Sequence, residues 1–202
     1  MAANIEQPRL LVVEGKEEEV FFGALIRHLG LQGIQAMPIG GKTQLRQNLK
    51  ALSLSSSFSQ VIAIGVVRDA NSDPKGAFQS VKDALQSAKL PAPDRPLVVA
   101  GKKPRISVLI LPEENTPETL EDLCLRAVEK DPATSCVEEY FECLRARGLS
   151  IPDNLSKARV QVFLASRKKA GVRLGEASEA GYWPWDGKAF DEVRKFLQQI
   201  CL

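Results

Sequence analysis

The stretch LLVVEGKEEE, residues 10–19, decides the fold of this chain. It joins an apolar run typical of a buried strand, Leu10 to Glu14, to an acid-rich helix start. Three consecutive glutamates, Glu17 to Glu19, lie where the helix macrodipole favours negative charge. Apolar residues then recur at helical spacing, so the stretch predicts a strand followed directly by an amphipathic helix over residues 17–29.

The same alternation continues along the chain. Strand-like runs rich in Val, Ile and Leu recur at Ile34 to Ile39, Val61 to Val67 and Ile106 to Leu111. Helical patterns lie between and after them, at residues 43–52, 78–88, 118–129, 135–147, 156–166 and 187–200. Strands that alternate with helices are typical of a parallel sheet with right-handed crossovers. We therefore predict an α/β fold, in which a Rossmann-like, mostly parallel sheet flanked by helices spans residues 8–130 and a helical C-terminal extension, residues 131–202, packs on it.

Two segments interrupt this pattern. Residues 90–105 contain four prolines around a short apolar piece, Leu97 to Ala100, which is a candidate edge strand. Residues 171–185 contain three glycines and end in Tyr182-Trp183-Pro184-Trp185. Aromatic side chains can stack on nucleic-acid bases, but tryptophans beside proline more often hold a loop against the body of a domain. We predict this packing role for both tryptophans.

The composition limits the classes of function. The chain has 202 residues, 44% hydrophobic and 26% charged, with a net charge of +2. This balance is too even for general attraction to nucleic acid, so binding of DNA or RNA would depend on clusters such as Lys102-Lys103 or Arg167-Lys168-Lys169.

Four cysteines without C-x-x-C spacing and a single histidine argue against structural zinc. The absence of a signal-like start or a run of about 18 apolar residues predicts a cytoplasmic protein without membrane contact. The sequence does not indicate an oligomeric state.

Acidic residues follow two of the predicted strands. Glu14 ends the first run, and Val61 to Val67 is followed by Arg68-Asp69-Ala70-Asn71-Ser72-Asp73. Neighbouring parallel strands lie about 4.8 Å apart, so carboxylates at their C-terminal ends can meet in one crevice. They repel one another there unless a cation joins them. The pattern therefore predicts a divalent-metal site that includes Glu14 and Asp69.

Short motifs at successive strand ends give the chain a resemblance to the TOPRIM domain. This is the metal-binding module shared by primases, type IA and II topoisomerases and the nucleases of the overcoming-lysogenization-defect class. The chain is most similar to stand-alone TOPRIM-like proteins of undetermined function, over roughly residues 8–130. The motifs are Glu14-Gly15-Lys16-Glu17-Glu18, Gly40-Gly41-Lys42, Asp69-Ala70-Asn71 and Leu120-Glu121-Asp122-Leu123.

The resemblance implies roles for particular residues. Glu14 takes the position of the family's general acid/base or metal ligand, and Asp69 the position of an aspartate that holds magnesium. The nuclease branch implies further ligands at Glu18 and Glu121, and an assisting lysine for which Lys157 is a candidate. The implied cofactor is Mg²⁺ or Mn²⁺, and the implied activity is that of a nuclease or phosphodiester-transfer enzyme on DNA or RNA.

One position departs from the family pattern. The second aspartate of the family pair is Asn71 here, and an amide offers an oxygen to Mg²⁺ without a charge, so the affinity should fall. Asp73 could compensate if the chain stays extended, because alternate residues then face the same side. Two hypotheses follow: a shifted metal site, or a catalytically degenerate accessory or binding protein.

Simpler interpretations apply to the same residues. Glu17 to Glu19 favour the helix dipole with or without metal, Asp69 or Asp73 could cap the helix after Pro74, and Glu121 could lie on a solvated helix face. Residues 36–43, AMPIGGKT, also fit a relaxed phosphate-binding loop and would predict a P-loop-type NTPase. Pro38 within the loop and a complete strand-helix unit before it argue against that alternative.

Overall fold

The structure is a computed structural model that describes residues 4–70, 73–111 and 119–202. Within these residues the chain forms a four-stranded sheet in the order β2-β1-β3-β4, with every neighbouring pair parallel. The strands are β1 (Arg9–Val13), β2 (Ile34–Pro38), β3 (Ala63–Asp69) and β4 (Arg105–Leu111). The predicted α/β fold with a parallel sheet is confirmed.

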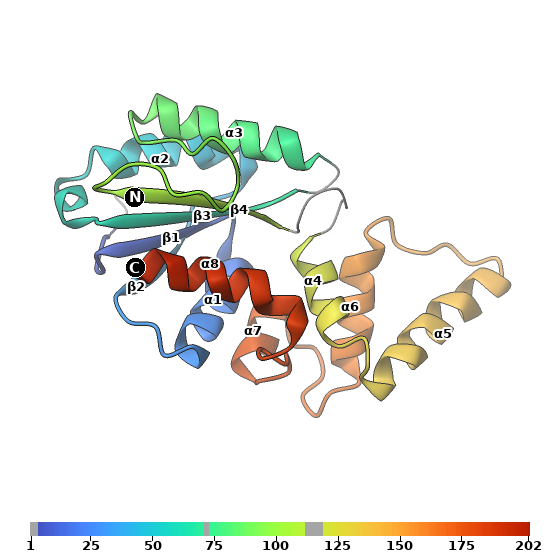
Figure 1. Cartoon of the computed structure of the whole chain (residues 1–202). Coiled ribbons are helices and arrows are strands. Elements are labelled where there is room, and N and C mark those ends of the chain that lie inside the picture. Colours follow the sequence, from blue (N-terminus) through green and yellow to red (C-terminus); the bar gives the residue numbers. More distant parts are fainter. Residues whose placement is uncertain (1–3, 71–72, 112–118) are drawn as a thin grey trace.

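Helices cover both faces of the sheet (Figure 1). On one face lie α2 (Leu45–Ser53) and α3 (Pro74–Ser87), and on the other lie α1 (Lys16–His28) and α8 (Asp191–Cys201). The short helix α7 (Leu174–Glu179) packs against α1. Residues 120–167 form a helical lobe beside the sheet, with helices α4 (Leu120–Ala127), α5 (Pro132–Ala146) and α6 (Leu155–Ala165). Short 3₁₀ segments are η1 (Lys42–Gln44), η2 (Ser56–Gln60) and η3 (Lys188–Phe190).

The central strand β1 explains why its sequence is continuously apolar. Leu10 and Val12 pack into the core beneath α2 and α3, whereas Leu11 and Val13 pack into the core formed with α1 and α8. All four side chains are fully buried. A strand covered on both faces has no solvent-facing side, so it lacks the polar alternation of a half-exposed strand.

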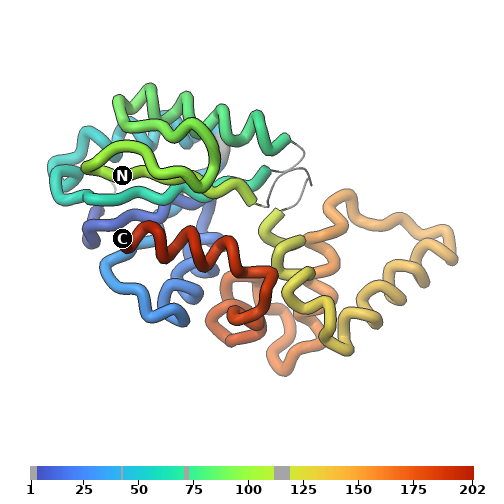
Figure 2. Tube along the Cα trace, in the orientation of Figure 1, coloured from blue at the N-terminus to red at the C-terminus, as the bar shows by residue number. Residues whose placement is uncertain are grey.

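The C-terminal helix completes one of these cores. Figure 2 shows α8 lying along the sheet, and it contacts β3 and β4. Contact is closest at Gly65, where an added Cβ would lie 2.3 Å from Cδ1 of Ile200 and 3.0 Å from Cζ of Phe196. Residues after 190 are therefore part of the hydrophobic core of the sheet.

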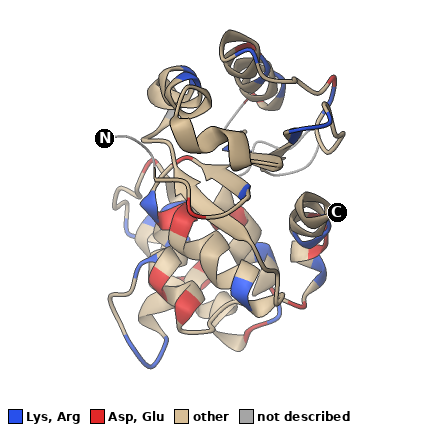
Figure 3. Cartoon of the chain, turned by 90° about the vertical axis from the view of Figure 1, so that its left-hand side faces the viewer, with Lys and Arg blue, Asp and Glu red and all other residues tan. Residues whose placement is uncertain are grey.

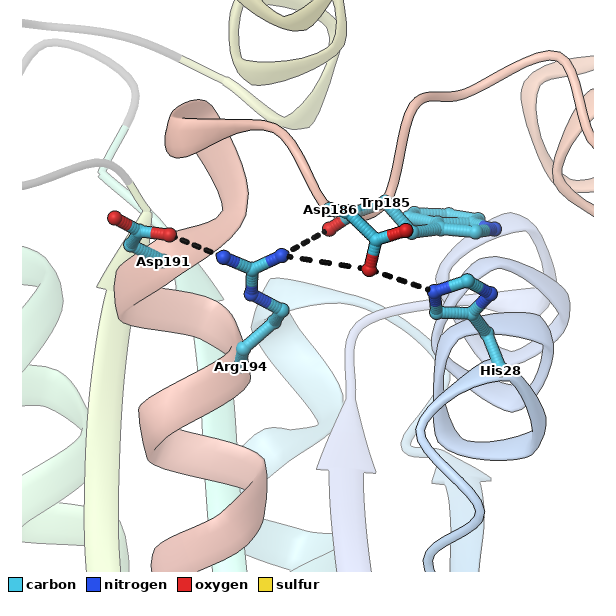
Figure 4. Close-up of polar contacts among 5 residues, drawn as sticks. All are labelled: His28, Trp185, Asp186, Asp191 and Arg194. Carbon is cyan, nitrogen blue, oxygen red and sulfur yellow. Dashed lines mark hydrogen bonds and ion pairs between the residues drawn. The ribbon is translucent and has the colours of Figure 1, made fainter.

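Both tryptophans hold the C-terminal segment onto the body of the protein, as predicted. Trp183 and Trp185 are buried, and their rings lie 6.0 Å from Phe163 and 5.0 Å from Phe21, respectively. Polar contacts fasten the same segment (Figure 4): Arg194 donates a 2.8 Å hydrogen bond to the Trp185 carbonyl, and His28 Nε2 lies 3.1 Å from Asp186 Oδ1. These contacts join the segment to α8 and α1.

Three local features differ from the predictions. Helix α3 begins at Pro74 rather than at residue 78, because Asp73 caps it and proline fits its first turn. Helix α7 lies within the glycine-containing segment, where Gly175 allows it to approach Val20 of α1. Leu97 to Ala100 forms an isolated antiparallel bridge between Ala100 and Ile106 rather than a strand. Across the described ranges, no helix is long and apolar enough to cross a membrane.

Candidate metal centre

The carboxyl ends of β1 and β3 bring the predicted acids to one edge of the sheet. The two strands are parallel neighbours, and their register pairs Val12 with Val66, so Glu14 and Arg68 are level with each other beyond it. Asp69 ends β3, and helix α1 begins immediately after Gly15. We refer to this region, together with the start of α4, as the carboxyl edge.

A buried ion pair joins the two strands at this edge. Arg68 Nε lies 3.1 Å from Glu14 Oε1, and the exposed fractions of the two side chains are 7% for Arg68 and 15% for Glu14. The distance defines an ion pair, but the geometry is not that of a hydrogen bond: among the described residues, Glu14 Oε1, Arg68 Nε and Arg68 Nη1 have no hydrogen-bond partner. The charges are therefore paired while these buried polar atoms are not saturated.

A second feature of the edge is repulsion among its carboxylates. The pKa of Glu18 is raised above its ordinary value, mainly because the side chain is buried, and further because Glu14 and Glu121 repel its negative charge. Backbone hydrogen bonds at Glu18 and Gly15 oppose this shift only in part. The structure thus brings two predicted residues, Glu14 after β1 and Glu121 of α4, within electrostatic range of a third, Glu18 of α1.

Asp69, at the end of β3, lies within electrostatic range of Cys124 in α4. Cys124 is fully buried, and burial raises its pKa well above the ordinary value, with additional contributions from Glu121, Asp122 and Asp69. Glu121 therefore acts on both Glu18 and Cys124. Its neighbour Asp122 is occupied in a capping box, where its Oδ2 accepts hydrogen bonds from the backbone and hydroxyl of Thr119.

Other predicted site residues have separate positions. Asp73 Oδ1 accepts a 2.8 Å hydrogen bond from the Gly76 backbone, so this carboxylate caps α3. Lys157 is exposed in the first turn of α6. Asn71 and the side chain of Lys42 lie outside the described residues.

The donor chemistry of the carboxyl edge suits a hard divalent cation, because Glu14, Glu18, Asp69 and Glu121 all offer carboxylate oxygens. Glu14 Oε1 is buried without a hydrogen bond to the described residues, so it is a candidate ligand atom that Arg68 occupies only through an ion pair. In the arrangement described, however, no three His, Cys, Asp or Glu side chains within residues 4–70, 73–111 and 119–202 are placed to hold one metal ion. The residue types fit the cation, while their present positions do not surround it.

The phosphate-binding-loop alternative does not match the backbone. Ala36, Met37 and Pro38 belong to β2 and pair with Leu11, Val12 and Val13 of β1. The remaining turn is short, and it is fixed by a 2.9 Å hydrogen bond from the Gly41 N–H to the Glu14 carbonyl. A loop that wraps a phosphate needs those residues free of strand pairing, so the geometry disfavours a P-loop.

Arg68 is the functional candidate that the sequence analysis missed. The sequence does contain a signal for it, since Arg68 is a charged residue between the apolar run Val61 to Val67 and Asp69. Its importance depends on the register of β3 against β1, which places it level with Glu14. That register is a tertiary property and is not encoded in the local motif.

Comparison with solved structures identifies a shared fold. Two crystal structures of the C-terminal region of the OLD protein from Xanthomonas campestris pv. campestris, one phased with iodine and one with platinum, each give a TM-score of 0.53. Their sequences are 15% and 14% identical to this chain; the matches cover 98% and 96% of it, and 95% and 92% of the OLD chains. OLD is the overcoming-lysogenization-defect class to which the sequence resemblance pointed. The TOPRIM-like fold is confirmed.

Comparison at the level of sequence gives a family. Among curated proteins none matches the chain. A family model described as "Protein of unknown function (DUF3226)" matches residues 8–202, which is nearly the whole sequence. The chain therefore belongs to the DUF3226 family.

Proposed function

We propose that this protein binds Mg²⁺ or Mn²⁺ at the carboxyl edge and uses it to cleave or transfer phosphodiester bonds of DNA or RNA. Glu14, Glu18, Asp69 and Glu121 would hold the cation. The TOPRIM-like fold shared with the OLD C-terminal region supports this assignment, since the sequence resemblance places the family's acids at the same strand ends. Asn71, Asp73 and Lys157 stay secondary candidates.

The chemistry explains why such residues would gather there. A phosphodiester brings negative charge to the site, and a bound divalent cation neutralises that charge and stabilises the leaving oxygen. The carboxylates would supply oxygen ligands, and Glu14, which follows β1 and pairs with Arg68 of β3, is the candidate to accept or return a proton. Basic and acidic residues occur side by side along the chain in Figure 3, so contacts with nucleic acid would be local.

The observation that carries the proposal is that Glu14, which follows β1, and Glu121 of α4 both repel the negative charge of the largely buried Glu18 of α1. Acids brought together in a half-buried position lower the stability of the fold. Their presence there therefore points to a role other than stability. Simple helix-dipole stabilisation accounts for Glu17 to Glu19 in the first turn of α1. It does not account for the approach of Glu14 and Glu121 to Glu18.

The test is cleavage of plasmid DNA and single-stranded RNA by the purified protein with Mn²⁺, without metal, and with EDTA. We expect metal-dependent cutting that falls by at least about a hundredfold in Glu14→Gln, because the variant loses a charged ligand or proton acceptor. Glu6→Gln is the matched control, since Glu6 is exposed before β1 begins, and it should cut like the original protein. Cutting that persists unchanged in Glu14→Gln would contradict the proposal.

A second candidate function is a nucleic-acid-binding or accessory role without catalysis. Asn71 in place of a family aspartate favours it, as does the lack of a three-ligand arrangement among the described residues. This alternative predicts that the protein shifts labelled DNA or RNA in a gel with or without Mn²⁺ and cuts neither. The cleavage assay therefore separates the two functions directly.

A further inference from the structure

The Glu14–Arg68 pair differs from a pair built only for stability. Arginine and carboxylate pair most strongly when two N–H groups point at the two oxygens. Here the guanidinium approaches one oxygen at 3.1 Å, and both Nε and Nη1 are buried without hydrogen bonds to the described residues. Arg167 also has an unbonded Nε, but its Nη2 donates a 2.9 Å hydrogen bond to Asp131. The Glu14 and Arg68 charges are therefore paired, whereas the hydrogen bonds of these two side chains are incomplete.

Arg68 places a positive charge among the acidic residues of the carboxyl edge. Its side chain is 93% buried, since its exposed fraction is 7%. Glu14 also repels Glu18, and Glu121 lies within range of Glu18. A guanidinium fixed beside Glu14 offsets part of this negative charge, as a bound cation would.

We propose that Arg68 is an internal counter-ion that competes with the divalent cation for the Glu14 carboxylate, so that cation binding separates the Glu14–Arg68 pair. The proposal rests on the metal-binding part of the proposed function. It accounts for a buried ion pair at a site whose acids suit a metal but, over the part of the chain that the structure describes, do not surround one. Arg68 is in this sense a positioning residue, because it acts through Glu14.

The consequence is a defined effect on metal affinity. A cation that binds Glu14 must displace the guanidinium or lie close to its positive charge. At an effective dielectric of about 20, repulsion between a guanidinium and a divalent ion a few ångströms apart is large. Removing the charge of Arg68 should therefore tighten cation binding, whereas removal of a residue that only supports the site should weaken it.

The test is a titration with Mn²⁺ alone at neutral pH, followed by the loss of the electron paramagnetic resonance signal of free Mn²⁺. We expect Arg68→Met to bind Mn²⁺ at least about tenfold more tightly than the original protein. Arg9→Met is the matched control: Arg9 begins β1 at the other end of the sheet, where its Nη2 donates to the Cys201 carbonyl, so its loss should leave the affinity unchanged. Circular dichroism establishes that each variant is folded.

A second variant, Arg68→Gln, keeps the test decisive if Arg68→Met does not fold. Arg68→Gln removes the charge but keeps N–H donors for Glu14, and it should show the same tightening and a larger rise in melting temperature with Mn²⁺ than the original protein. Equal or weaker Mn²⁺ binding in both variants, with binding still abolished by Glu14→Gln, would overturn the role of Arg68 and leave the metal site intact. Absence of Mn²⁺ binding in the original protein and in both Arg68 variants would overturn the proposed function as well.

Discussion

The helical lobe and the carboxyl edge use acidic residues in opposite ways. In the lobe, a hydrogen bond from Arg167 lowers the pKa of Asp131, and the bond from the Ala133 N–H, through which Asp131 caps α5, lowers it further. At the carboxyl edge, burial and the neighbouring acids raise the pKa of Glu18. Asp131 therefore stabilises the fold as a carboxylate, whereas Glu18 is disfavoured as one. The contrast agrees with the proposal that the edge binds a cation, because the raised pKa of Glu18 marks a carboxylate that the fold alone does not stabilise.

The largest predicted effect on stability comes from breaking the buried ion pair between Glu14 and Arg68 at the carboxyl edge. Arg68→Met leaves Glu14 without its counter-ion in a largely buried position, and we expect the free energy of unfolding to fall by about 3–5 kcal/mol at pH 7 without metal. The double variant Glu14→Gln/Arg68→Met should recover most of that loss. Urea denaturation measures both. A loss below about 1 kcal/mol in the single variant would place the edge pair among ordinary surface pairs.

A smaller effect of opposite sign is expected at Glu18. Because its folded-state pKa is raised above the ordinary value of 4.5, the folded protein binds this proton more tightly than the unfolded chain does. The cost of the buried carboxylate is thus full above the folded-state pKa and fades as the pH falls toward the unfolded-state value.

Glu18→Gln should therefore stabilise the protein by about 1 kcal/mol at pH 7, with the gain disappearing in acid. Denaturation curves across this pH range provide the measurement. Glu19→Gln is the matched control, because Glu19 pairs with Lys16 on the same helix and should lose no more than about 0.5 kcal/mol. If Glu18→Gln destabilised the protein at neutral pH, Glu18 would stabilise the fold as a carboxylate just as Asp131 does, and the contrast between the edge and the lobe would be wrong.

The smallest effect is predicted within the lobe. The lowered pKa of Asp131 means that its stabilising contribution is present above the unfolded-state pKa and is lost as the pH falls through the folded-state value. Asp131→Asn keeps a capping side chain but loses the ion pair with Arg167, so we expect a loss of about 0.5–1 kcal/mol at pH 7 that vanishes in acid. Thermal melts at pH 7 and in acid test this prediction. If Asp131→Asn stabilised the protein at pH 7, Asp131 would not stabilise the lobe as a carboxylate.

Much of the fold could be predicted from local sequence because the strands are buried on both faces. Leu10 to Val13 and Val61 to Val67 are continuously apolar, which marks central strands without tertiary information. Helix α7 could not be predicted in the same way, since it has only six residues and is held by contacts with α1, including a hydrogen bond from the Gly175 N–H to Glu17.

For the candidate site, the sequence indicates which residue types are present, but it does not indicate which of them contact one another. Glu14 and Asp69 are visible at strand ends, and the approach of Glu18 and Glu121 agrees with their motif positions. The pairing of Glu14 with Arg68 depends on strand register, which local periodicity does not specify. The cap formed by Asp73 was one of two roles allowed by the sequence, and the structure places its carboxylate on Gly76.

Diffraction from crystals soaked in Mn²⁺ tests most directly the claim that the carboxyl edge is built to bind a cation. The account predicts an anomalous peak within about 2.5 Å of a Glu14 carboxylate oxygen, with Arg68 moved away from it. A peak located elsewhere, or an unchanged Glu14–Arg68 pair with no peak at the edge, would contradict it.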